Sequence, residues 1–402
     1  MPHQTNNNIQ SQSRSRLILK IGVVVFCRLV LNTARRFAYP FAPALSRGLG
    51  VPLTAITSLI AVNWATSLLG VFFGPIADRI GYRMMMIIGM VSLGIGMLAG
   101  GFLPIYGVMI IALFLAGLGK SLFDPAVQAY ISERVPYQRR GMAIGLMEIS
   151  WAGSTLLGIP LIALLIDGVG WRSPFFVMGL TGILGAFSVA LFFPANQRGI
   201  SQSTSVQSYS KILQFLVKDK LSLGVMAYVF FLSAAIDNLF VVYGAWLEKA
   251  FDVGIVVLGL GTSVIGVAEL LGEIMVATIS DRFGLKRVVT CGIALCIVTY
   301  VLLPFISQSF FLALAALFVH FLFFEFTIIS SLALCTELRP EMRATMIAGF
   351  IAAAGLGRIL GALAGGPVWL TGGIVLTCMI SAGLTVLALM SLRWGLRGWD
   401  RR

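Results

Sequence analysis

Apolar runs of roughly 20 residues recur along the whole chain and constrain its fold more than any other feature. Each is long enough to cross the ~30 Å hydrocarbon core of a bilayer as an α-helix. Twelve such runs lie at about 17–45, 54–76, 84–103, 105–131, 140–166, 174–194, 221–247, 255–279, 288–306, 309–335, 343–368 and 371–392. They lack the period-two alternation of a transmembrane β-barrel. The sequence therefore predicts an all-α membrane protein with twelve transmembrane helices.

The composition agrees with a membrane location. Of 402 residues, 58% are hydrophobic and only 11% are charged, whereas a soluble domain has about 25% charged residues. The five cysteines lie inside apolar runs, at a spacing that fits neither a zinc site nor a disulfide scaffold. We interpret them as packing residues and predict no metal and no cofactor.

One long polar segment divides the chain into two parts. The stretch "ANQRGISQSTSVQSYSKILQFLVKDK" separates the sixth run from the seventh and is the longest polar break between runs. The expected organisation is a polar tail (1–16), a six-helix half (17–194), a linker (195–220), a second six-helix half (221–392) and a short tail (393–402).

The distribution of basic residues predicts the topology. If the N-terminus is cytoplasmic, 21 Lys and Arg residues fall in inside segments and 3 in outside segments. Such an excess is the signature of cytoplasmic loops. Both termini are therefore expected in the cytoplasm, and the net charge of +13 is interpreted as topology, with no nucleic-acid partner.

A short charged motif occurs twice, once in each half. Both copies follow the pattern Asp-Arg-x-Gly-x-basic. They consist of Asp78, Arg79, Gly81 and Arg83, and, 203 residues later, of Asp281, Arg282, Gly284 and Lys286. A second match shifts by 204 residues and relates Glu133, Pro136 and Arg139 to Glu337, Pro340 and Arg343. These matches predict two pseudo-symmetric halves related by an axis along the membrane normal.

Twelve helices, a six-plus-six repeat and this motif together resemble the major facilitator superfamily. The first copy, with Gly74 before Asp78, carries the superfamily's loop signature Gly-x-x-x-Asp-Arg-x-Gly. The chain length and short central linker resemble the bacterial drug/proton antiporter and sugar-efflux branch. The fourth run departs from that branch, because Leu113 stands four residues before Gly117, where an arginine is usual.

The resemblance implies a role for the motif at the cytoplasmic gate. Gly81 can supply the positive φ that a tight turn needs. Asp78 can pair with an arginine or cap the eleventh helix, which starts near Arg343. We hypothesise that Asp78 is a latch between the halves.

Ionisable groups at membrane depth are costly and are functional candidates by default. In the superfamily the first, fourth, seventh and tenth helices line the cavity, with the second, fifth, eighth and eleventh beside them. The candidates for substrate binding or coupling all lie on these helices and are Arg28, Arg35, Lys120, Asp124, Glu148, Trp151, Asp237, Glu269, Glu273, His320, Glu325 and Arg358.

Two groupings concern ion pairs. Arg35 and Asp237 lie at equivalent depths in the repeat and could meet near the outer end of the cavity; alternatively, Arg35 and Arg36 snorkel to the outer headgroups. Lys120 and Asp124 are four residues apart and share a helix face. They form either a binding or gating element or a local structural pair.

A third grouping concerns protons. Glu269 and Glu273 are also four residues apart, and like charges on one face favour protonation of one of them. Glu325 and His320 are further titratable candidates. The alternative is that one glutamate pairs with Arg358 and is structural. Separately, the segment from Tyr39 to Pro43 is expected to kink the first helix.

The favoured function is secondary active transport of a small organic solute by alternating access in the plasma (inner) membrane, with proton-linked efflux. The alternative is a symporter or facilitator for an organic anion or a sugar. An intramembrane enzyme is disfavoured, because the chain has only two histidines and no phosphate-binding Gly-x-x-x-x-Gly-Lys loop. The expected partners are the substrate, a proton and the bilayer, and we expect a monomer.

Overall fold

The computed structural model describes residues 3–70, 73, 76–77, 80–134, 149–194 and 218–399. Within these ranges, the side chains of residues 3–18, 132–134, 277, 279–282 and 344 are outside the description. All regular elements of the described ranges are helical.

The first half contains the elements that the sequence places before the linker. They are α1 (His3–Arg36), α2 (Ala42–Leu49), α3 (Leu53–Ala65), η1 (Thr66–Leu69), α5 (Tyr82–Phe102), α6 (Tyr106–Arg134), η2 (Ser154–Gly158), α8 (Ile159–Val169) and α9 (Ser173–Phe192). The η2 segment is a single π-helical turn, a geometry that is frequent at functional sites.

The second half repeats the same sequence of long helices. Its elements are α11 (Lys220–Phe240), α12 (Tyr243–Phe251), α13 (Ile255–Phe283), α14 (Leu285–Ile306), α15 (Phe310–Leu338), η3 (Pro340–Met342) and α16 (Arg343–Gly395). Within the 53 residues of α16, Gly373 has a φ of 61° and a ψ of −156°, so two helices meet there. This break lies close to the predicted boundary between the last two runs.

The structure agrees with twelve membrane-spanning helices when the α2–α3 pair counts as one span, α16 counts as two and α1 is included. Nine helices of the described ranges are long and apolar enough to cross a bilayer, and the bent α2–α3 pair makes up to ten. Counting α16 as two helices gives an eleventh. The twelfth is α1, whose apolar part carries Lys20, Arg28, Arg35 and Arg36. These four charges lower the mean hydropathy of α1, so α1 is not among the nine candidate spans, although all three arginines are buried.

The first helix ends where its prolines predict. α1 stops at Arg36, a turn follows, and α2 begins at Ala42 with Pro43 in its first turn. Proline has no amide hydrogen and fits the first turn of a helix better than its interior. The predicted kink is confirmed, and the turn places Arg36 and Tyr39 at the end of α1.

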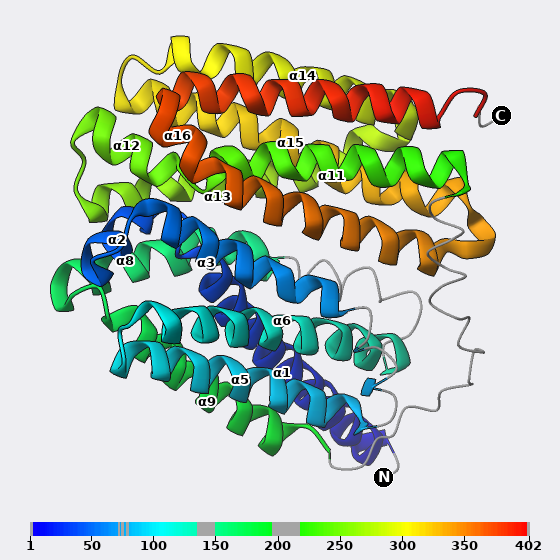
Figure 1. Ribbon diagram of the computed structural model, residues 1–402. Helices are drawn as coiled ribbons and strands as arrows, with labels where there is room; N and C mark the ends of the chain where they lie inside the picture. Colours follow the sequence, from blue (N-terminus) through cyan, green and yellow to red (C-terminus); the bar gives the residue numbers. More distant parts are fainter. Residues whose placement is uncertain are drawn as a thin grey trace.

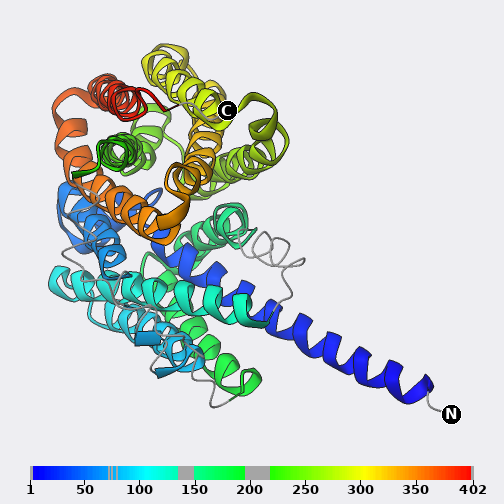
Figure 2. The same cartoon turned by 90° about the vertical axis from the view of Figure 1, so that its right-hand side faces the viewer.

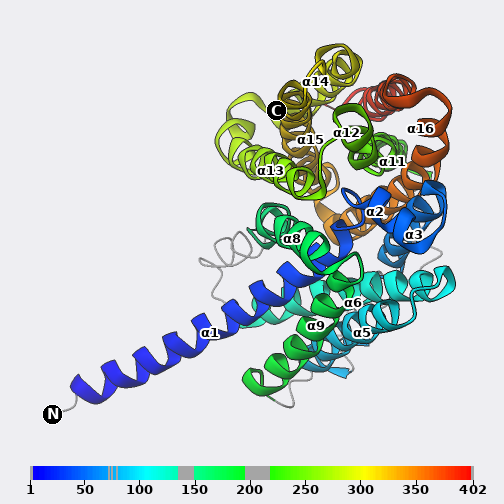
Figure 3. The same cartoon turned by 90° about the vertical axis from the view of Figure 1, so that its left-hand side faces the viewer.

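The helices form two bundles that lie side by side, one from each half (Figure 1). Both ends of the chain lie at one end of the molecule, which we call the terminal end. At the opposite, distal end the halves are in contact: α8 packs on α13, α3 packs on α16 and α2 packs on α12. The view onto the distal end shows these elements close together (Figure 3), and the view onto the terminal end shows α1 projecting from the first bundle (Figure 2).

The repeated motif has the same structural role in each half. Gly81 and Gly284 have φ angles of 96° and 81°, in the region that favours glycine, and they precede α5 and α14. The expected positive φ of Gly81 is confirmed. Arg83 donates to the carbonyl of Ala190 near the end of α9 at 2.5 Å, and Lys286 donates to the carbonyl of Trp399 beyond α16 at 2.7 Å. These basic side chains therefore bind the end of the last helix of their own half.

Candidate functional site

An ion pair joins the two halves near mid-length of the bundle. Arg36 of α1 donates from Nη1 to Oε2 of Glu269 at 3.0 Å and from Nη2 to Oε1 at 2.5 Å. Thr155, in the π-helical turn, donates to the same Glu269 at 3.4 Å. The guanidinium of Arg36 lies 4.4 Å from the ring centroid of Trp151. This two-point contact is the strong form of an arginine–carboxylate pair, and it crosses between the bundles.

A second network crosses the same interface around Asp237 of α11. The Tyr39 hydroxyl donates to Oδ1 of Asp237 at 2.6 Å, and Arg358 of α16 donates to Oδ2 at 2.8 Å. Trp64 of α3 donates its indole N–H to the Tyr39 hydroxyl at 2.5 Å, and its ring lies 4.4 Å from the Arg358 guanidinium. We call the two cross-half networks, around Glu269 and around Asp237, the seam.

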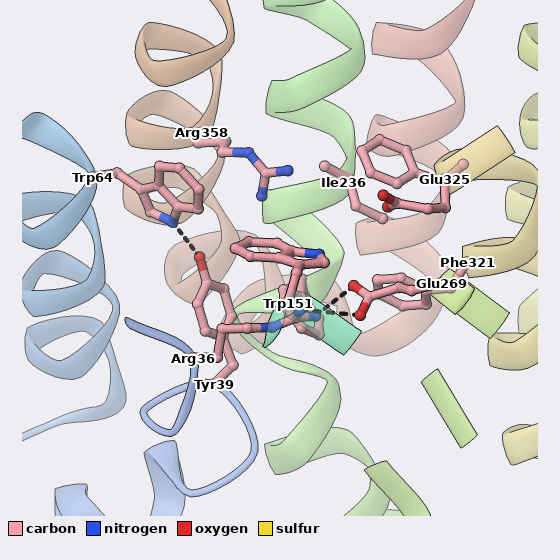
Figure 4. A pocket seen from close by; sticks show the side chains of 11 residues that line it. Arg36, Tyr39, Trp64, Trp151, Ile236, Glu269, Phe321, Glu325 and Arg358 are labelled. Carbon is pink, nitrogen blue, oxygen red and sulfur yellow. Dashed lines mark hydrogen bonds and ion pairs between the residues drawn. The ribbon is translucent and has the colours of Figure 1, made fainter. Parts of the chain in front are cut away.

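The seam surrounds a small cavity that Figure 4 shows in close-up. Its lining includes side chains from both halves and is formed by Arg36, Tyr39, Trp64, Trp151, Ile236, Phe240, Glu269, Phe321, Phe324, Glu325 and Arg358. Its free volume is about 20 Å³, room for about one water molecule. The carboxyl groups of Glu269 and Glu325 face this cavity (Figure 4). At the seam, the halves are closed onto each other.

A larger cavity lies between the halves on the terminal side of the seam. Its volume is about 490 Å³, within the range of small-molecule sites. The lining comes from α1, η1 and α6 of the first half and from α16 of the second, and consists of Arg35, Ser67, Gly70, Lys120, Ser121, Asp124, Pro125, Gln128, Ile347, Ala348 and Ile351. We call this space the terminal-side cavity.

Arg35 enters the terminal-side cavity from a cradle of neutral groups. Its Nε donates to Oδ1 of Asn63 at 2.9 Å, and its Nη2 donates to the Asn63 carbonyl at 3.1 Å and to the Thr66 hydroxyl at 3.4 Å. Its guanidinium lies 4.2 Å from the ring centroid of Trp64. Asn63 is fixed in turn by donating to the Leu113 carbonyl at 2.8 Å.

Lys120 and Asp124 meet on one face of α6, as their spacing predicts. Lys120 Nζ lies 2.6 Å from Oδ2 of Asp124 and donates to Oδ1 of Asn32 at 2.6 Å. Arg28 reaches the other oxygen of Asp124 at 3.1 Å. Pro125 lies inside α6 directly after this cluster. The carboxylate is thus shared by two cations, which ties α1 to α6 within the first half.

The two ion pairs predicted for Arg35 and Arg358 were wrong, because each arginine has a different partner. Arg35 does not bind Asp237; Asn63 holds it, and Arg358 takes the carboxylate instead. Arg358 therefore does not pair with a glutamate, because Glu269 binds Arg36. The snorkelling alternative was wrong too, since Arg35 and Arg36 are 7% and 3% exposed. The turn after Arg36 explains the difference, because it ends the helix and brings Tyr39 beside Asp237.

His320, predicted as a coupling residue, lies apart from both cavities. It is fully buried inside the second half, where Nδ1 lies 2.8 Å from the Thr299 hydroxyl and the ring lies 4.1 Å from that of Tyr300. It lines neither the small cavity nor the terminal-side cavity. Glu273 is half-buried and also absent from both linings.

Several predicted residues are outside the described part. These are Glu148, Gly74, Asp78 and Arg79, together with the side chains of Asp281 and Arg282. The proposed latch at Asp78 thus remains a prediction. Arg83 and Lys286, predicted as gate residues, contact backbone within their own halves.

The sequence did not predict Tyr39 and Thr155 as site residues. Each had a signal nearby in the sequence: Tyr39 precedes Pro40, and Thr155 follows Trp151 by about one helical turn.

Two pseudo-symmetric bundles of membrane-spanning helices, closed at one end and enclosing a cavity towards the other, define a membrane transporter. The chain belongs to the Major Facilitator Superfamily, whose sequence model matches residues 24–243 and 225–400. It is therefore a multi-pass membrane protein, and its family transports small molecules.

Relatives in sequence are bacterial members of the same superfamily. The chain is 22% identical to the uncharacterized MFS-type transporter YwfA of Bacillus subtilis strain 168, over 96% of this chain and 94% of that protein. It is 23% identical to YceJ of the same strain, but that match covers only 59% of this chain and 60% of YceJ. It is 28% identical to the multidrug resistance protein MdtG of Escherichia coli O17:K52:H18, over 54% and 53% of the two chains.

Solved structures with the same fold confirm the twelve-helix architecture. The nucleoside transporter NupG superposes with a TM-score of 0.77 at 14% identity, over 94% of this chain and 99% of NupG. A D-xylose–proton symporter superposes with a TM-score of 0.77 at 17% identity, over 94% and 97% of the two chains.

Proposed function

We propose that the protein is a secondary active transporter that exports a small organic solute across the bacterial inner membrane in exchange for protons. The observation that carries this proposal is the asymmetry of the interface between the halves. A seam of buried charges closes it around about 20 Å³, while about 490 Å³ stays free on the terminal side. Alternating access needs one closed and one accessible side around a common site.

The orientation follows from the basic residues. The 21 to 3 bias supports a cytoplasmic location for both termini. The terminal-side cavity then faces the cytoplasm, and the structure is an inward-facing state. A solute to be exported would enter from this side.

Opening towards the outside requires the seam to break. Arg36–Glu269 and Tyr39–Asp237 both join opposite halves, so neither contact can survive separation of α1 from α11 and α13. The Asp237–Arg358 pair lies within the second half and can stay intact. In each transport cycle, therefore, only the contacts between the halves break and form again, and the contact within the second half persists.

Proton coupling is best placed at Glu269 with Glu325 beside it. When Arg36 leaves, Glu269 becomes a buried carboxylate without its cation, which is costly in low-dielectric surroundings. Taking up a proton removes that cost. Glu325 is 7% exposed and has no hydrogen bond or ion pair to any residue in the described ranges, so it can hold a proton within the same cavity.

The proposal that the solute is exported is based on proteins that are similar to this chain. MdtG is named a multidrug resistance protein, and the loop motif resembles the drug/proton antiporter branch. This support is by analogy. We also propose that one chain suffices, since both linings are formed within it.

The test uses purified protein in proteoliposomes with an imposed pH gradient. Solute flux that follows the gradient in wild type and becomes independent of it in Glu269→Gln supports the proposal. Glu341→Gln is the control, because Glu341 is exposed at the terminal end and should leave coupling unchanged. Gradient-independent flux in the wild type would overturn the coupling.

A symporter or facilitator for an organic anion or a sugar is the second candidate. The fold shared with a D-xylose–proton symporter and the neutral cradle of Arg35 favour it. Flux in the same direction as the protons would select the symporter over the antiporter in the assay above.

A further inference from the structure

We propose that Arg35 is the docking point for a carboxylate or similar anionic group of the transported solute. The inference rests on the proposed transport cavity and adds the class of its substrate. It depends on the contrast between Arg35 and the other cations at the interface.

The hydrogen-bond partners of Arg35 are all neutral, and the carboxylates of Asp124 and Asp237 act on it only over a longer distance. Its hydrogen bonds go to an amide oxygen, a backbone carbonyl and a hydroxyl, through Nε and Nη2. Its Nη1 makes no hydrogen bond to any residue that the structure describes, and the side chain lines the terminal-side cavity. A buried arginine with an unused donor facing a cavity is prepared for an external acceptor.

The other cations near the two cavities each have a carboxylate. Arg28 and Lys120 bind Asp124, Arg36 binds Glu269, and Arg358 binds Asp237, with nitrogen–oxygen distances of 3.1, 2.6, 2.5 and 2.8 Å. Arg35 is buried to 93%, since only 7% of its surface is exposed. Holding a charge at that depth with neutral partners is costly, and an anionic ligand would offset this cost.

The other residues that line the terminal-side cavity narrow the chemical class of the solute. Lys120 lines the same cavity and uses two of its three N–H groups for Asp124 and Asn32, so a third donor is left. The opposite wall, from α16, is apolar and includes Ile347 and Ile351. A volume of about 490 Å³ suits a monocarboxylate with an apolar body.

The experiment measures binding to the full-length purified protein in nanodiscs. The probes are benzoate, 1-naphthoate, indole-3-acetate and octanoate, each with its neutral primary amide. We expect at least one acid to bind about ten-fold or more tightly than its amide, since a charge-assisted hydrogen bond contributes about 1.5–3 kcal/mol and 1.4 kcal/mol is ten-fold. Arg35→Gln should abolish the preference and Arg35→Lys should retain part of it.

The control is Arg172→Gln, because Arg172 is exposed at the distal end and should keep the full preference. Equal affinity for acids and amides, or a preference unchanged by Arg35→Gln, would overturn the inference. Binding is separate from transport: gradient-coupled flux without acid preference sinks this inference alone. Acid preference that depends on Arg35, without any flux, sinks the proposed function alone.

Discussion

Arg36 reaches across the seam to Glu269, whereas Arg35, the residue before it, stays in its own half and binds Asn63 and Thr66. Successive residues on a helix point about 100° apart, so one helix can serve the seam with one side chain and the cavity with the next. Contacts across the seam must break in every transport cycle, while contacts within a half need not. Substitutions at the seam should therefore act mainly on transport, and substitutions within a half, away from the terminal-side cavity, mainly on stability.

The largest effect on transport is expected when the charge of Arg36 is removed. Arg36→Gln leaves Glu269 buried without its cation, and losing one partner of a buried pair costs about 3–5 kcal/mol. We expect the transport rate to fall at least about 100-fold in the proteoliposome assay. The reversed pair, Arg36→Glu with Glu269→Arg, should recover part of the rate. If Arg36→Gln transports at the wild-type rate, the hypothesis that the seam must form to close the distal side is refuted.

A milder seam substitution is Tyr39→Phe. It removes the hydroxyl that joins Trp64 to Asp237 but keeps the ring, whose centroid lies 4.3 Å from that of Phe240. A hydrogen bond to a charged group contributes about 1.5–3 kcal/mol, so we expect a transport rate lower by about ten-fold with little change in thermal stability. An equal loss in both measurements would show that the hydroxyl supports the fold and not the seam.

Within the second half, the turns before α14 and α13 offer a matched pair of glycines, Gly284 and Gly254. Gly284 has a φ of 81° and open space around its Cβ direction, so Gly284→Ala strains only the backbone. We expect a loss of about 1 kcal/mol in unfolding free energy, measured by denaturation in detergent, and nearly normal transport. The control is Gly254→Ala, which has equally open space but no positive φ. Equal effects at the two positions would contradict the role of the turn.

The smallest effect is expected at the start of α11. Asp219 accepts from the Ser222 amide at 3.0 Å and pairs with Arg339 at 2.6 Å. Partial burial raises the pKa of Asp219, but the hydrogen bonds from Arg339 and Ser222 outweigh it and hold the pKa below its usual value.

Asp219→Asn keeps a capping oxygen and removes the charge, so the loss at neutral pH should be about 0.2–1 kcal/mol. A lowered folded-state pKa gives stability that is present above the unfolded pKa of about 3.9 and is lost as the pH falls through the folded value. The difference between wild type and variant should therefore shrink below about pH 4 in thermal unfolding. A difference that persists at lower pH would show that the charge is not its source.

The architecture could be predicted from the sequence because it depends on patterns that are local in the chain. Run length gave the helices, the proline after Tyr39 gave the break in the first one, and Gly81 gave the turn before α5. The polar partners could not be predicted, because they depend on which helices face each other and on side-chain direction. Arg36 with Glu269, and Arg358 with Asp237, join residues 233 and 121 positions apart. Buried His320 was equally plausible in the sequence, since a titratable residue carries no mark of which side of its helix it faces.

The seam account is tested most directly by the distance across the distal end during transport. Arg47 and Glu248 join α2 to α12 there at 2.5 Å and are partly exposed, so Arg47→Cys and Glu248→Cys can be spin-labelled together once exposed Cys291 is changed to Ser. Pulsed electron paramagnetic resonance on the variant in liposomes should give one short distance without solute. We predict a second, longer distance when transported solute and a proton gradient are present. A single unchanged distance in a variant that still transports would contradict the opening of the seam.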